Sequence, residues 1–543
     1  MDLIAALTAL PELDVATDEV TLNQASVDAS VFRVQPQAVV YPTNAAQVGQ
    51  LVQFAQQHAA EGVSLTPRSA GTDMSGGPLT SSIVVDMTRH FNHILAVGSA
   101  TAVAQPGVYY RDFEATTLKQ GWLMPAYPAS REICTIGGMV ATNAGGEKSL
   151  QYGQVDRYVT SLKAVLADGK EYVIEPLEGD DVTAKMKQQD FEGELYYQIA
   201  TLIEQHQAAL EQSKPKVSKN SSGYNIWDVW DGHRFDLTKL LVGSQGTLGI
   251  ITEITFRLIK PKPFRKLLVM YLADLHDLAR LVTAVMRYQP EAFESYDNHT
   301  IDVGLRYFPS LLKKIPMRSL LGLLVNIAPQ LLKIMVGKKP ALVLMAEFSG
   351  DNIEEVLSRT QAAQAAIKSW QGASKIIHSP AEVAMYWAVR RGSFNLLRLH
   401  AGKRHTAPFI DDICVRPEKL PAFLPELNAL MAKYDILFTI AGHVGDGNFH
   451  IIPLMDLSDP ASLTVIENLG SEVFDLVLKY GGSLSGEHND GLIRSHYLQR
   501  QFGEETYRVF EGIKNIFDPK HIFNPGKKIG VSWEQAKHYL KHS

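Results

Sequence analysis

Residues 134–146 read Cys-Thr-Ile-Gly-Gly-Met-Val-Ala-Thr-Asn-Ala-Gly-Gly, a run with four glycines and a largely apolar centre. The apolar centre predicts burial. A buried backbone with so few side chains needs something to fill the space and to pair its polar groups. A large planar cofactor would do both. This stretch therefore favours a fold built around a bound organic molecule.

Two further glycine-rich segments support this prediction. Residues 67–77 (PRSAGTDMSGG) follow a predicted strand, and residues 243–252 (GSQGTLGIIT) lead into one. Small residues let backbone N–H groups converge on an anion, and glycine tolerates the φ values that such a nest needs. The first segment is neither a Walker loop nor the dinucleotide fingerprint, and alone it could be a surface turn. Three such segments within about 200 residues are hard to explain as turns.

The chain is long enough for several domains. Its 543 residues exceed what one hydrophobic core usually holds. Strand and helix patterns alternate up to a break at Pro261 and Pro263, and a second alternation follows it. We expect a helical lead-in over residues 1–34, a cofactor-binding domain over 35–262, a substrate or cap domain over 263–500, and a C-terminal helix and tail over 501–543.

Hydrophobic periodicity predicts the main elements. Helices are expected over residues 47–58, 275–288, 353–370 and 420–434. Strands are expected over residues 63–66, 83–86, 101–105, 162–166, 249–258, 266–272, 341–348 and 437–441, with a hairpin turn at Asp168-Gly169.

Composition excludes several classes of function. The formal net charge is -6, so no global basic field attracts nucleic acid, and no nucleic-acid partner is expected. Two cysteines, Cys134 and Cys414, cannot hold an iron–sulfur cluster or form a disulfide framework. The N-terminus lacks a basic flank of the secretory type, and no apolar stretch of about 20 residues could span a membrane. A cytoplasmic location is expected.

Residues 306–340 differ from their surroundings. They mix large apolar side chains with seven Lys or Arg residues and contain no acidic residue. Such a segment is typical of an amphipathic element on a membrane surface, here the inner face. A helical hairpin packed on its own domain would explain the same composition.

Two segments near the end of the second domain carry histidine and acid. Residues 441–450 (AGHVGDGNFH) contain His443, His450 and three glycines in a run that follows a predicted strand. Residues 481–491 (GGSLSGEHNDG) add Glu487 and His488. Imidazole nitrogens with a carboxylate suit zinc, iron or manganese, although a lone histidine is more often a hydrogen-bonded polar group.

Together these motifs resemble the FAD-binding superfamily of vanillyl-alcohol oxidase and p-cresol methylhydroxylase, and within it the D-2-hydroxy acid dehydrogenases that act on D-lactate, glycolate or D-2-hydroxyglutarate. The resemblance covers residues 35–528. It implies an α+β fold in which two subdomains hold FAD, a cap domain with a large antiparallel sheet covers the flavin, and the C-terminal tail returns to the FAD domain. The residues that it assigns to FAD are Arg68, Ser69, Ala70, Gly71, Thr72, Asp73, Ser130, Thr135, Gly137, Gly138, Asn143, Gly153, Ile250 and Asn524.

The resemblance also implies the chemistry. Thr72 stands where some relatives attach FAD through histidine, so FAD should be bound non-covalently. His443, His450 and Glu487 would bind a divalent metal, and His488 would be the general base. A substrate carboxylate would pair with Arg390, because guanidinium offers two parallel donors, and Lys403 is a weaker candidate.

Two positions depart from the family pattern. Asn489 stands where relatives usually have glycine, and asparagine is the next most tolerant residue of positive φ. Phe394 stands where the D-2-hydroxyglutarate enzymes have a small hydroxyl residue, which counts against that substrate.

The expected activity is oxidation of a D-2-hydroxy acid by hydride transfer to FAD, with a metal-assisted histidine base. The electron acceptor would be a quinone, a cytochrome, an electron-transfer protein or oxygen. Two alternatives remain open: a flavin oxidase of another alcohol that needs no metal, and an FAD-binding subunit that only relays electrons.

Overall fold

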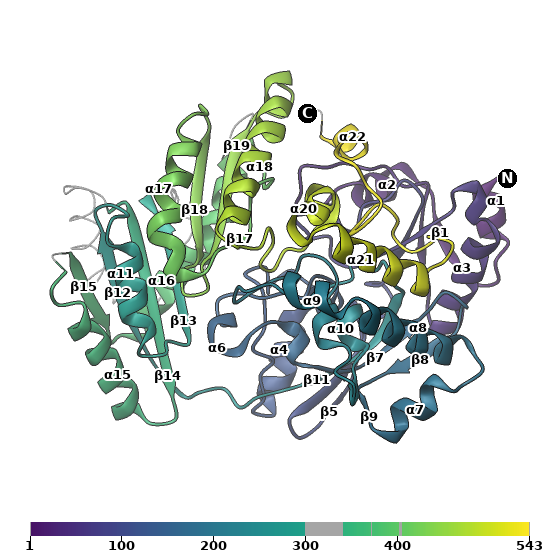
Figure 1. The fold of residues 1–543 in the computed structure, drawn as a ribbon, viewed down its shortest axis with the longest axis horizontal. Coiled ribbons are helices and arrows are strands. Elements are labelled where there is room, and N and C mark those ends of the chain that lie inside the picture. Colours follow the sequence, from purple (N-terminus) through teal and green to yellow (C-terminus); the bar gives the residue numbers. More distant parts are fainter. Residues whose placement is uncertain (1, 299–339, 371, 401–403, 542–543) are drawn as a thin grey trace.

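The computed structural model describes residues 2–298, 340–370, 372–400 and 404–541. Lys403 and nearly all of the basic apolar segment 306–340 lie outside the described residues. Three large β-sheets, the helices that cover them and a small two-stranded sheet make up the described chain (Figure 1). The small sheet pairs β9 (Leu177–Glu178) with β10 (Arg234–Phe235).

The first sheet has the strand order β1-β2-β4-β3. Its strands are β1 (Asp14–Ala16), β2 (Ala38–Tyr41), β3 (Leu65–Arg68) and β4 (Ile83–Asp86). The three strands β2, β4 and β3 are parallel, as a helix crossover such as α3 (Ala45–Gln57) allows. Asn44 caps the start of α3, because its side chain accepts a hydrogen bond from the Gln47 amide. Helices α1 (Leu3–Thr8) and α2 (Glu19–Ala25) precede this sheet along the chain.

The second sheet is antiparallel, with the order β5-β6-β11-β7-β8. Its strands are β5 (Ile94–Val97), β6 (Thr101–Ala104), β7 (Val159–Val165), β8 (Glu171–Ile174) and β11 (Ile250–Arg257). Strand β11 alternates buried and half-buried residues, so one face carries Ile250, Ile254 and Phe256 into the core. The helices of this half include α4 (Tyr110–Lys119), α5 (Ile136–Thr142), α6 (Ser149–Tyr152), α7 (Asp180–Met186), α8 (Phe191–Gln205), α9 (Gln207–Ser213) and α10 (Thr238–Leu241).

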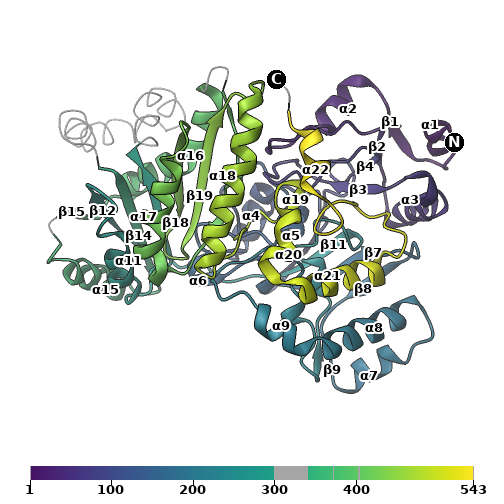
Figure 2. The same cartoon turned by 45° about the horizontal axis from the view of Figure 1, so that its top comes forward.

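The third sheet has eight strands in the order β15-β12-β14-β13-β18-β19-β16, with β17 also on β19. Its strands are β12 (Phe264–Leu272), β13 (Ala292–Asp297), β14 (Leu342–Gly350), β15 (Ala373–Ile377), β16 (His405–Thr406), β17 (Ile413–Cys414), β18 (Leu437–His443) and β19 (Asn448–Met455), and every pairing is antiparallel. One face packs on α11 (Leu278–Met286), α15 (Ile353–Ala366), α17 (Leu420–Met431) and α18 (Pro460–Lys479). Helix α16 (Pro380–His400) packs on the other face through Tyr386 and Trp387. Figures 1 and 2 show this sheet and its helices as one half of the molecule and the first two sheets as the other.

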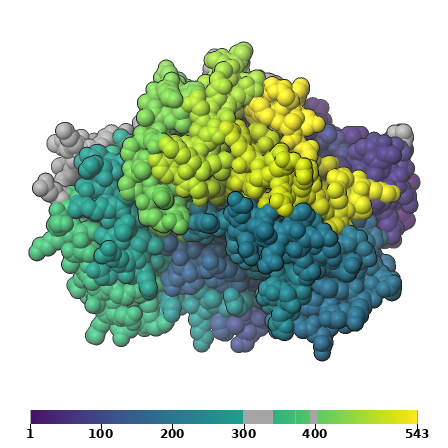
Figure 3. All heavy atoms as spheres, viewed as in Figure 1, coloured from purple at the N-terminus to yellow at the C-terminus, as the bar shows by residue number. Residues whose placement is uncertain are grey.

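The C-terminal residues cross from the third sheet to the first. They form α19 (Gly491–Arg494), α20 (Leu498–Phe502), α21 (Glu504–Phe517) and α22 (Trp533–Ala536), which Figure 3 shows in yellow along the junction of the two halves. The tail reaches the first sheet at β3, where the amide of Leu65 donates to the Ile522 carbonyl (2.8 Å) and the amide of Asn524 donates to the Leu65 carbonyl (2.9 Å).

The expected fold class is confirmed: the structure mixes helices with sheets and contains a large antiparallel sheet. The predicted helix 47–58 is α3 (Ala45–Gln57), the strand 83–86 is β4, and the strand 249–258 is β11. The Asp168-Gly169 turn joins β7 to β8 as predicted. Strands β13 and β19 and helix α18 have no counterpart among the predicted elements. Among the described residues, no helix combines the length and the apolar character needed to cross a bilayer.

Candidate active site

One cavity of about 540 Å³ lies where the three sheets meet, and the three glycine-rich segments line it together. The lining includes Ser69 to Met74 from the first segment, Cys134 to Ala144 in part from the second, and Gln245, Gly246 and Gly249 from the third. On the opposite side the third sheet contributes Thr439, Ala441, His450 and Ile452. Small residues from the first two sheets and their loops thus face residues of the third sheet across one cavity.

The first glycine-rich loop bends toward this cavity with Ser69, Ala70, Gly71, Thr72 and Asp73 on its surface. Gly71 has φ +67°, and a Cβ there would lie 2.3 Å from Arg68 Nη2, so both conformation and space require glycine. Arg68 itself does not line the cavity. Its guanidinium donates to the carbonyls of Ala25 (3.1 Å) and Val27 (2.7 Å), and it holds the loop from behind.

The second loop turns into helix α5 at the cavity wall. Thr135 caps this helix by accepting from the Gly138 amide (3.3 Å), and Ser130, Thr135, Gly137 and Gly138 all line the cavity. A Cβ on Gly137 would lie 2.4 Å from Pro106 Cβ, so the backbone approaches another chain segment too closely for a side chain. Nine of the predicted FAD residues therefore line a single cavity.

The other five predicted FAD residues, Arg68 included, lie behind the lining. Asn143 ends α5 with φ 52°, and its side chain accepts from the Asp156 amide (3.0 Å). Gly153 ends α6, and Ile250 is fully buried in the first sheet's core, whereas Ile251 reaches the cavity. Asn524 donates to the carbonyls of Gly77 (2.9 Å) and Gln245 (2.7 Å), so it ties the first glycine-rich segment to the third. Direct contact of these five with a cofactor stays a prediction.

The histidines and the acid selected from the sequence converge at the cavity. Nε2 of His443, His450 and His488 lie 3.1, 3.5 and 4.0 Å from the same oxygen, Glu487 Oε1. The hairpin β18–β19 supplies the first two histidines, and the turn before α19 supplies Glu487 and His488. Three imidazole nitrogens around one carboxylate oxygen form a donor set that suits a divalent transition metal.

A carboxylate lies beside the second nitrogen of each imidazole. Nδ1 of His443 lies 2.6 Å from Glu294 Oε1, whereas Nδ1 of His450 and of His488 lie 3.2 and 2.8 Å from the two oxygens of Asp411. Such partners orient imidazole rings so that Nε2 faces the centre, as in many metal sites. The donor set and its supporting carboxylates therefore fit a bound metal.

The buried charges of this cluster shift its pKa values. Burial alone would lower the pKa of His450, but Asp411 and then Glu487 outweigh it and raise that pKa to about 10. Burial would also lower the pKa of His488, but the charges of Asp412 and Asp411 outweigh it and raise that pKa. Burial would raise the pKa of Glu487, but Lys219 and His443 hold it well below its usual value. Glu487 is therefore ionised at neutral pH, as a ligand must be.

Asp412 also has an oxygen near His450, Glu487 and His488, within 4.8 Å of the others. Its Oδ2 accepts from the amides of Glu487 (2.9 Å) and His488 (2.7 Å) and from Ser485 Oγ (2.6 Å). Its Oδ1 accepts from Asn448 Nδ2 (3.0 Å). Because these donors already occupy both oxygens, Asp412 holds the turn that presents Glu487. His443 is therefore a better metal ligand than Asp412.

Arg390 and Arg391 both line the cavity from α16. Arg390 is 8% exposed, and its Nε and Nη2 lie 3.1 and 3.0 Å from Glu294 Oε2. Arg391 forms a two-pronged pair with Glu147, with Nε at 2.8 Å from Oε2. The guanidinium of Arg390 thus lies in the same cavity as the histidine cluster, and its pairing with a substrate carboxylate stays a prediction.

Comparison with known proteins matches both halves of the chain. A model of the FAD binding domain matches residues 36–175, and a model of the C-terminal domain of FAD linked oxidases matches residues 262–528. This chain belongs to the FAD-linked oxidases.

Individual relatives of this FAD-linked oxidase carry hydroxy acid names. D-2-hydroxyglutarate dehydrogenase of Pseudomonas putida is 28% identical over 529 residues, which cover 94% of this chain but 50% of that protein. The chain thus spans half the length of that relative. Glycolate oxidase subunit GlcD of Bacillus subtilis is 26% identical, and the match covers 91% of this chain and 89% of that subunit. The structure of p-cresol methylhydroxylase with substrate bound matches with a TM-score of 0.66 at 14% identity, over 96% of this chain and 94% of that one.

Three residues of the candidate site in this FAD-linked oxidase are not predicted by the sequence patterns. Glu294 lies between Arg390 and His443, and Lys219 Nζ lies 3.0 Å from Glu487 Oε2. Asp28 lines the cavity of about 540 Å³, which is called the FAD cavity from here on. Each stands alone in a segment without glycine clusters or repeated histidines, so no local pattern marked it. The one available signal was an acid or lysine inside a run of otherwise apolar or small residues, as in Phe293-Glu294-Ser295.

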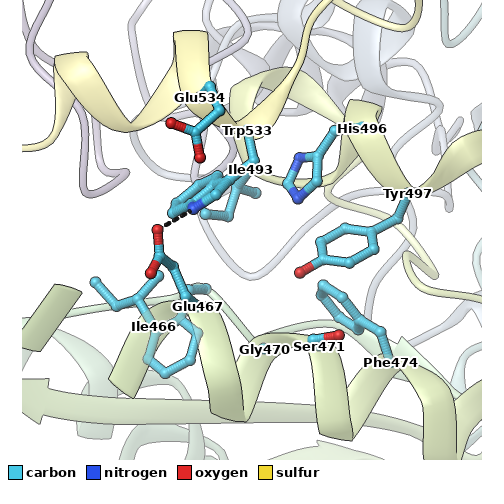
Figure 4. A pocket seen from close by; sticks show the side chains of 11 residues that line it. Ile466, Glu467, Gly470, Ser471, Phe474, Ile493, His496, Tyr497, Trp533 and Glu534 are labelled. Atoms are coloured by element: carbon cyan, nitrogen blue, oxygen red, sulfur yellow. Dashed lines mark hydrogen bonds between the residues drawn. The ribbon is translucent and has the colours of Figure 1, made fainter. Parts of the chain in front are cut away.

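A second cavity, of about 340 Å³, lies between α18, residues 493–497 and α22 (Figure 4). Its walls are largely aromatic, and Trp533 Nε1 donates to Glu467 Oε1 across one side (2.8 Å). Burial lowers the pKa of His496 to about 4, so this imidazole is neutral at pH 7. The described residues that line it include none of the predicted site residues. The FAD cavity is therefore the candidate active site.

Proposed function

We propose that this FAD-linked oxidase oxidises a D-2-hydroxy acid to the 2-oxo acid, with non-covalent FAD, a divalent metal and His488 as general base. The observation that carries the proposal is the convergence of three histidines on Glu487 at the cavity that Arg390 also lines. His450, His488 and Glu487 line the cavity, and His443 contacts Glu487 from behind them. Names of relatives, D-2-hydroxyglutarate dehydrogenase and glycolate oxidase subunit among them, support the substrate class.

The small-residue segments would hold FAD. Ser69 to Asp73 would surround the pyrophosphate with backbone amides, and Ser130, Thr135, Gly137 and Gly138 would line the flavin and ribityl chain. Arg68, Asn143, Gly153, Ile250 and Asn524 would act from behind, by fixing the segments that make contact. When bound, FAD accepts a hydride at N5 of its ring system.

His443, His450 and Glu487 would hold the metal, which is zinc, manganese or iron. A bound divalent cation supplies Lewis acidity, which lowers the pKa of an alcohol. Carboxylates behind His443 and His450 fix both rings in the orientation that ligation requires.

His488 would take the substrate's hydroxyl proton. Asp411 Oδ2 lies 2.8 Å from Nδ1 of His488, so Nε2 is the nitrogen turned toward the cluster. A positioned imidazole commonly contributes about 100-fold or more to a proton-transfer step. Arg390 would anchor the substrate carboxylate, because its planar fork matches two carboxylate oxygens.

The test is anaerobic mixing of the purified, FAD-containing protein with a panel of D- and L-2-hydroxy acids. We expect the absorbance of oxidised flavin to disappear with a D-2-hydroxy acid and to persist with its L enantiomer. His488→Gln should slow this bleaching by about 100-fold or more while FAD stays bound. The matched control is His538→Gln, which alters an exposed histidine close to the C-terminus.

Bleaching by an alcohol without a carboxylate would contradict the substrate class. Equal rates in the wild type and His488→Gln would contradict the base. A protein whose flavin stays oxidised with every acid would contradict the activity as a whole.

A further inference from the structure

Glu294 occupies a position that links two parts of the candidate site. It lies on β13, whose alternate residues Ala292 and Tyr296 pack against α16 on one face of the third sheet. Phe293, on the opposite face, belongs to the core beneath the other helices. Glu294 therefore points with Ala292 and Tyr296 toward the side of the sheet where α16 and the cavity lie.

The two oxygens of Glu294 serve two different groups. Oε2 accepts from Arg390 Nε at 3.1 Å and lies 3.0 Å from Arg390 Nη2. Oε1 lies 2.6 Å from Nδ1 of His443. The side chain of Glu294 is 2% exposed, so water does not compete for these contacts.

Each of these contacts fixes an orientation. Pairing at Nε and Nη2 sets the plane of the Arg390 guanidinium, because those two donors lie along one edge of the fork. The contact at Nδ1 sets the tautomer of His443 and turns its Nε2 toward Glu487 Oε1, 3.1 Å away.

We propose that Glu294 is a shared positioning residue that couples the carboxylate anchor Arg390 to the metal ligand His443. This inference rests on the function proposed above. Glu294 itself contacts neither substrate nor metal. Because one buried side chain holds both groups, it fixes the distance between the bound carboxylate and the cation. It thereby selects substrates whose hydroxyl is on the carbon next to the carboxylate.

The chemistry of the side chain makes the inference testable. An ionised carboxylate accepts at both oxygens, and here both face donors. In Glu294→Gln the amide NH₂ must face either the Arg390 guanidinium or the protonated Nδ1 of His443, so one of the two contacts becomes a clash between donors. The shape of the side chain is unchanged.

Glu291 provides the matched control. It is 1% exposed, lies three residues before Glu294, and also pairs with a cation, Lys148, at 3.4 Å. Tyr152 donates to the same oxygen at 3.1 Å. Glu291→Gln therefore removes an equally buried charge from the same segment of the chain. The contacts described for Glu291 involve neither Arg390 nor His443.

The experiment measures two quantities on FAD-containing protein that has been stripped of metal. Zn²⁺ affinity is measured by competition with a chromophoric chelator. After Zn²⁺ is restored, the apparent Kd of the D-2-hydroxy acid is taken from the concentration dependence of anaerobic flavin reduction. Glu294→Gln should weaken Zn²⁺ binding by about 10-fold to 100-fold and raise the acid's Kd by about 10-fold or more. Glu291→Gln should leave both within about twofold of wild type.

A second variant tests the coupling without changing Glu294. Arg390→Gln removes a cation, and through-space electrostatics alone predicts tighter Zn²⁺ binding. Positioning through Glu294 predicts weaker Zn²⁺ binding instead, because the Glu294 carboxylate loses the guanidinium that orients it. We expect Zn²⁺ binding at least about threefold weaker in Arg390→Gln.

The outcomes separate this inference from the proposed function. If the wild type binds no Zn²⁺ and no hydroxy acid reduces its flavin, both fall. If the wild type does both but Glu294→Gln behaves like Glu291→Gln, or if only one quantity changes, the shared role is wrong while the proposed function stands. Tighter or unchanged Zn²⁺ binding in Arg390→Gln would also overturn the coupling. FAD content and melting temperature identify any variant that fails to fold, and the remaining variant then decides.

Discussion

Asp28 places a carboxyl group in the wall of the FAD cavity, next to the loop expected to hold the pyrophosphate. Its Oδ1 accepts from the amide of Ser30 (2.9 Å), whereas its Oδ2 is buried without a hydrogen-bond partner in the described part of the chain. Burial, and then the nearby charge of Asp73, raise the pKa of Asp28 to about 7. A buried acid with that pKa is largely protonated below neutrality and can donate a hydrogen bond.

FAD binding should therefore depend on pH through Asp28. Phosphate charges nearby favour the protonated acid, so FAD raises the pKa of Asp28 further, and by linkage the affinity for FAD falls as pH rises above the free-protein value of about 7. The decline should approach about tenfold per pH unit just above neutrality. The check is titration of the FAD-depleted protein with FAD at pH values on both sides of neutrality.

Asp28→Asn keeps the shape and removes the titration. Its FAD affinity should be nearly independent of pH over this range, whereas Asp18→Asn, which alters the exposed cap of α2, should keep the wild-type slope. A pH-independent wild type would show that Asp28 does not face the phosphates.

At the scale of elements, the apolar pattern of the sequence predicted several helices and strands. Helix α3 and strand β11 have apolar residues at helical or alternating spacing, whereas β4 is a continuous run of buried apolar residues. The predicted bounds of these three elements differ from the observed ones by at most two residues. Strand β13 was missed because Glu294 and Asp297 are buried on it, and a strand with buried acids does not have an apolar pattern. Glu294 is a partner of the site residues Arg390 and His443, so the residue that serves the site also breaks the apolar pattern of the strand.

Sequence patterns likewise predict some residues of the candidate site and not others. Repeated histidine and glycine marked both segments that converge on Glu487, and small residues marked the loops that line the FAD cavity. The family resemblance assigns Ile250 to FAD, whereas the structure places Ile251 in the cavity wall and Ile250 in the core behind it. Contact of Ile250 with the cofactor stays a prediction. Lone partners such as Lys219 come from distant segments, and only the three-dimensional fold brings them to the site.

The C-terminal tail is predicted to hold the glycine-rich loops together through Asn524. Its Nδ2 donates to the carbonyls of Gly77 and Gln245, and its Oδ1 accepts from Thr66 Oγ1 at 3.1 Å. Asn524→Ala leaves three buried groups without partners, which should cost about 2–4 kcal/mol of stability and speed the release of FAD. Denaturant titration and the rate at which FAD fluorescence appears are the measurements.

Asn515→Ala is the control within the same tail. Asn515 is exposed and accepts only from His521 (2.8 Å) among the contacts described for its side chain, so its loss should change stability by less than about 0.5 kcal/mol. Equal FAD release from the two variants would mean that the tail does not brace the cofactor loops.

On the scale of the whole molecule, buried ion pairs join the half that would hold FAD to the half with the third sheet. Arg391 of α16 pairs with Glu147, which precedes α6, and Lys148 pairs with Glu291 at 3.4 Å. Lys219 reaches Glu487 at 3.0 Å and Asp446 at 3.4 Å. Each pair crosses the junction, so these buried pairs help to hold the two halves together around the cavity.

Lys219 offers the clearest test of this docking. Its side chain is 1% exposed, and burial would lower its pKa, but Glu487 and Asp446 raise it above the usual value, so the ammonium stays charged. Lys219→Met leaves two buried carboxylates without that cation, and breaking such a pair from one side costs about 3–5 kcal/mol. Lys214→Met, in the same segment, removes an exposed partner of Asp228 and should cost at most about 1 kcal/mol. We expect Lys219→Met alone to lower the urea midpoint and to expose the linker near Pro261 to protease, whereas equal behaviour of the two variants would mean that the halves dock without this buried pair.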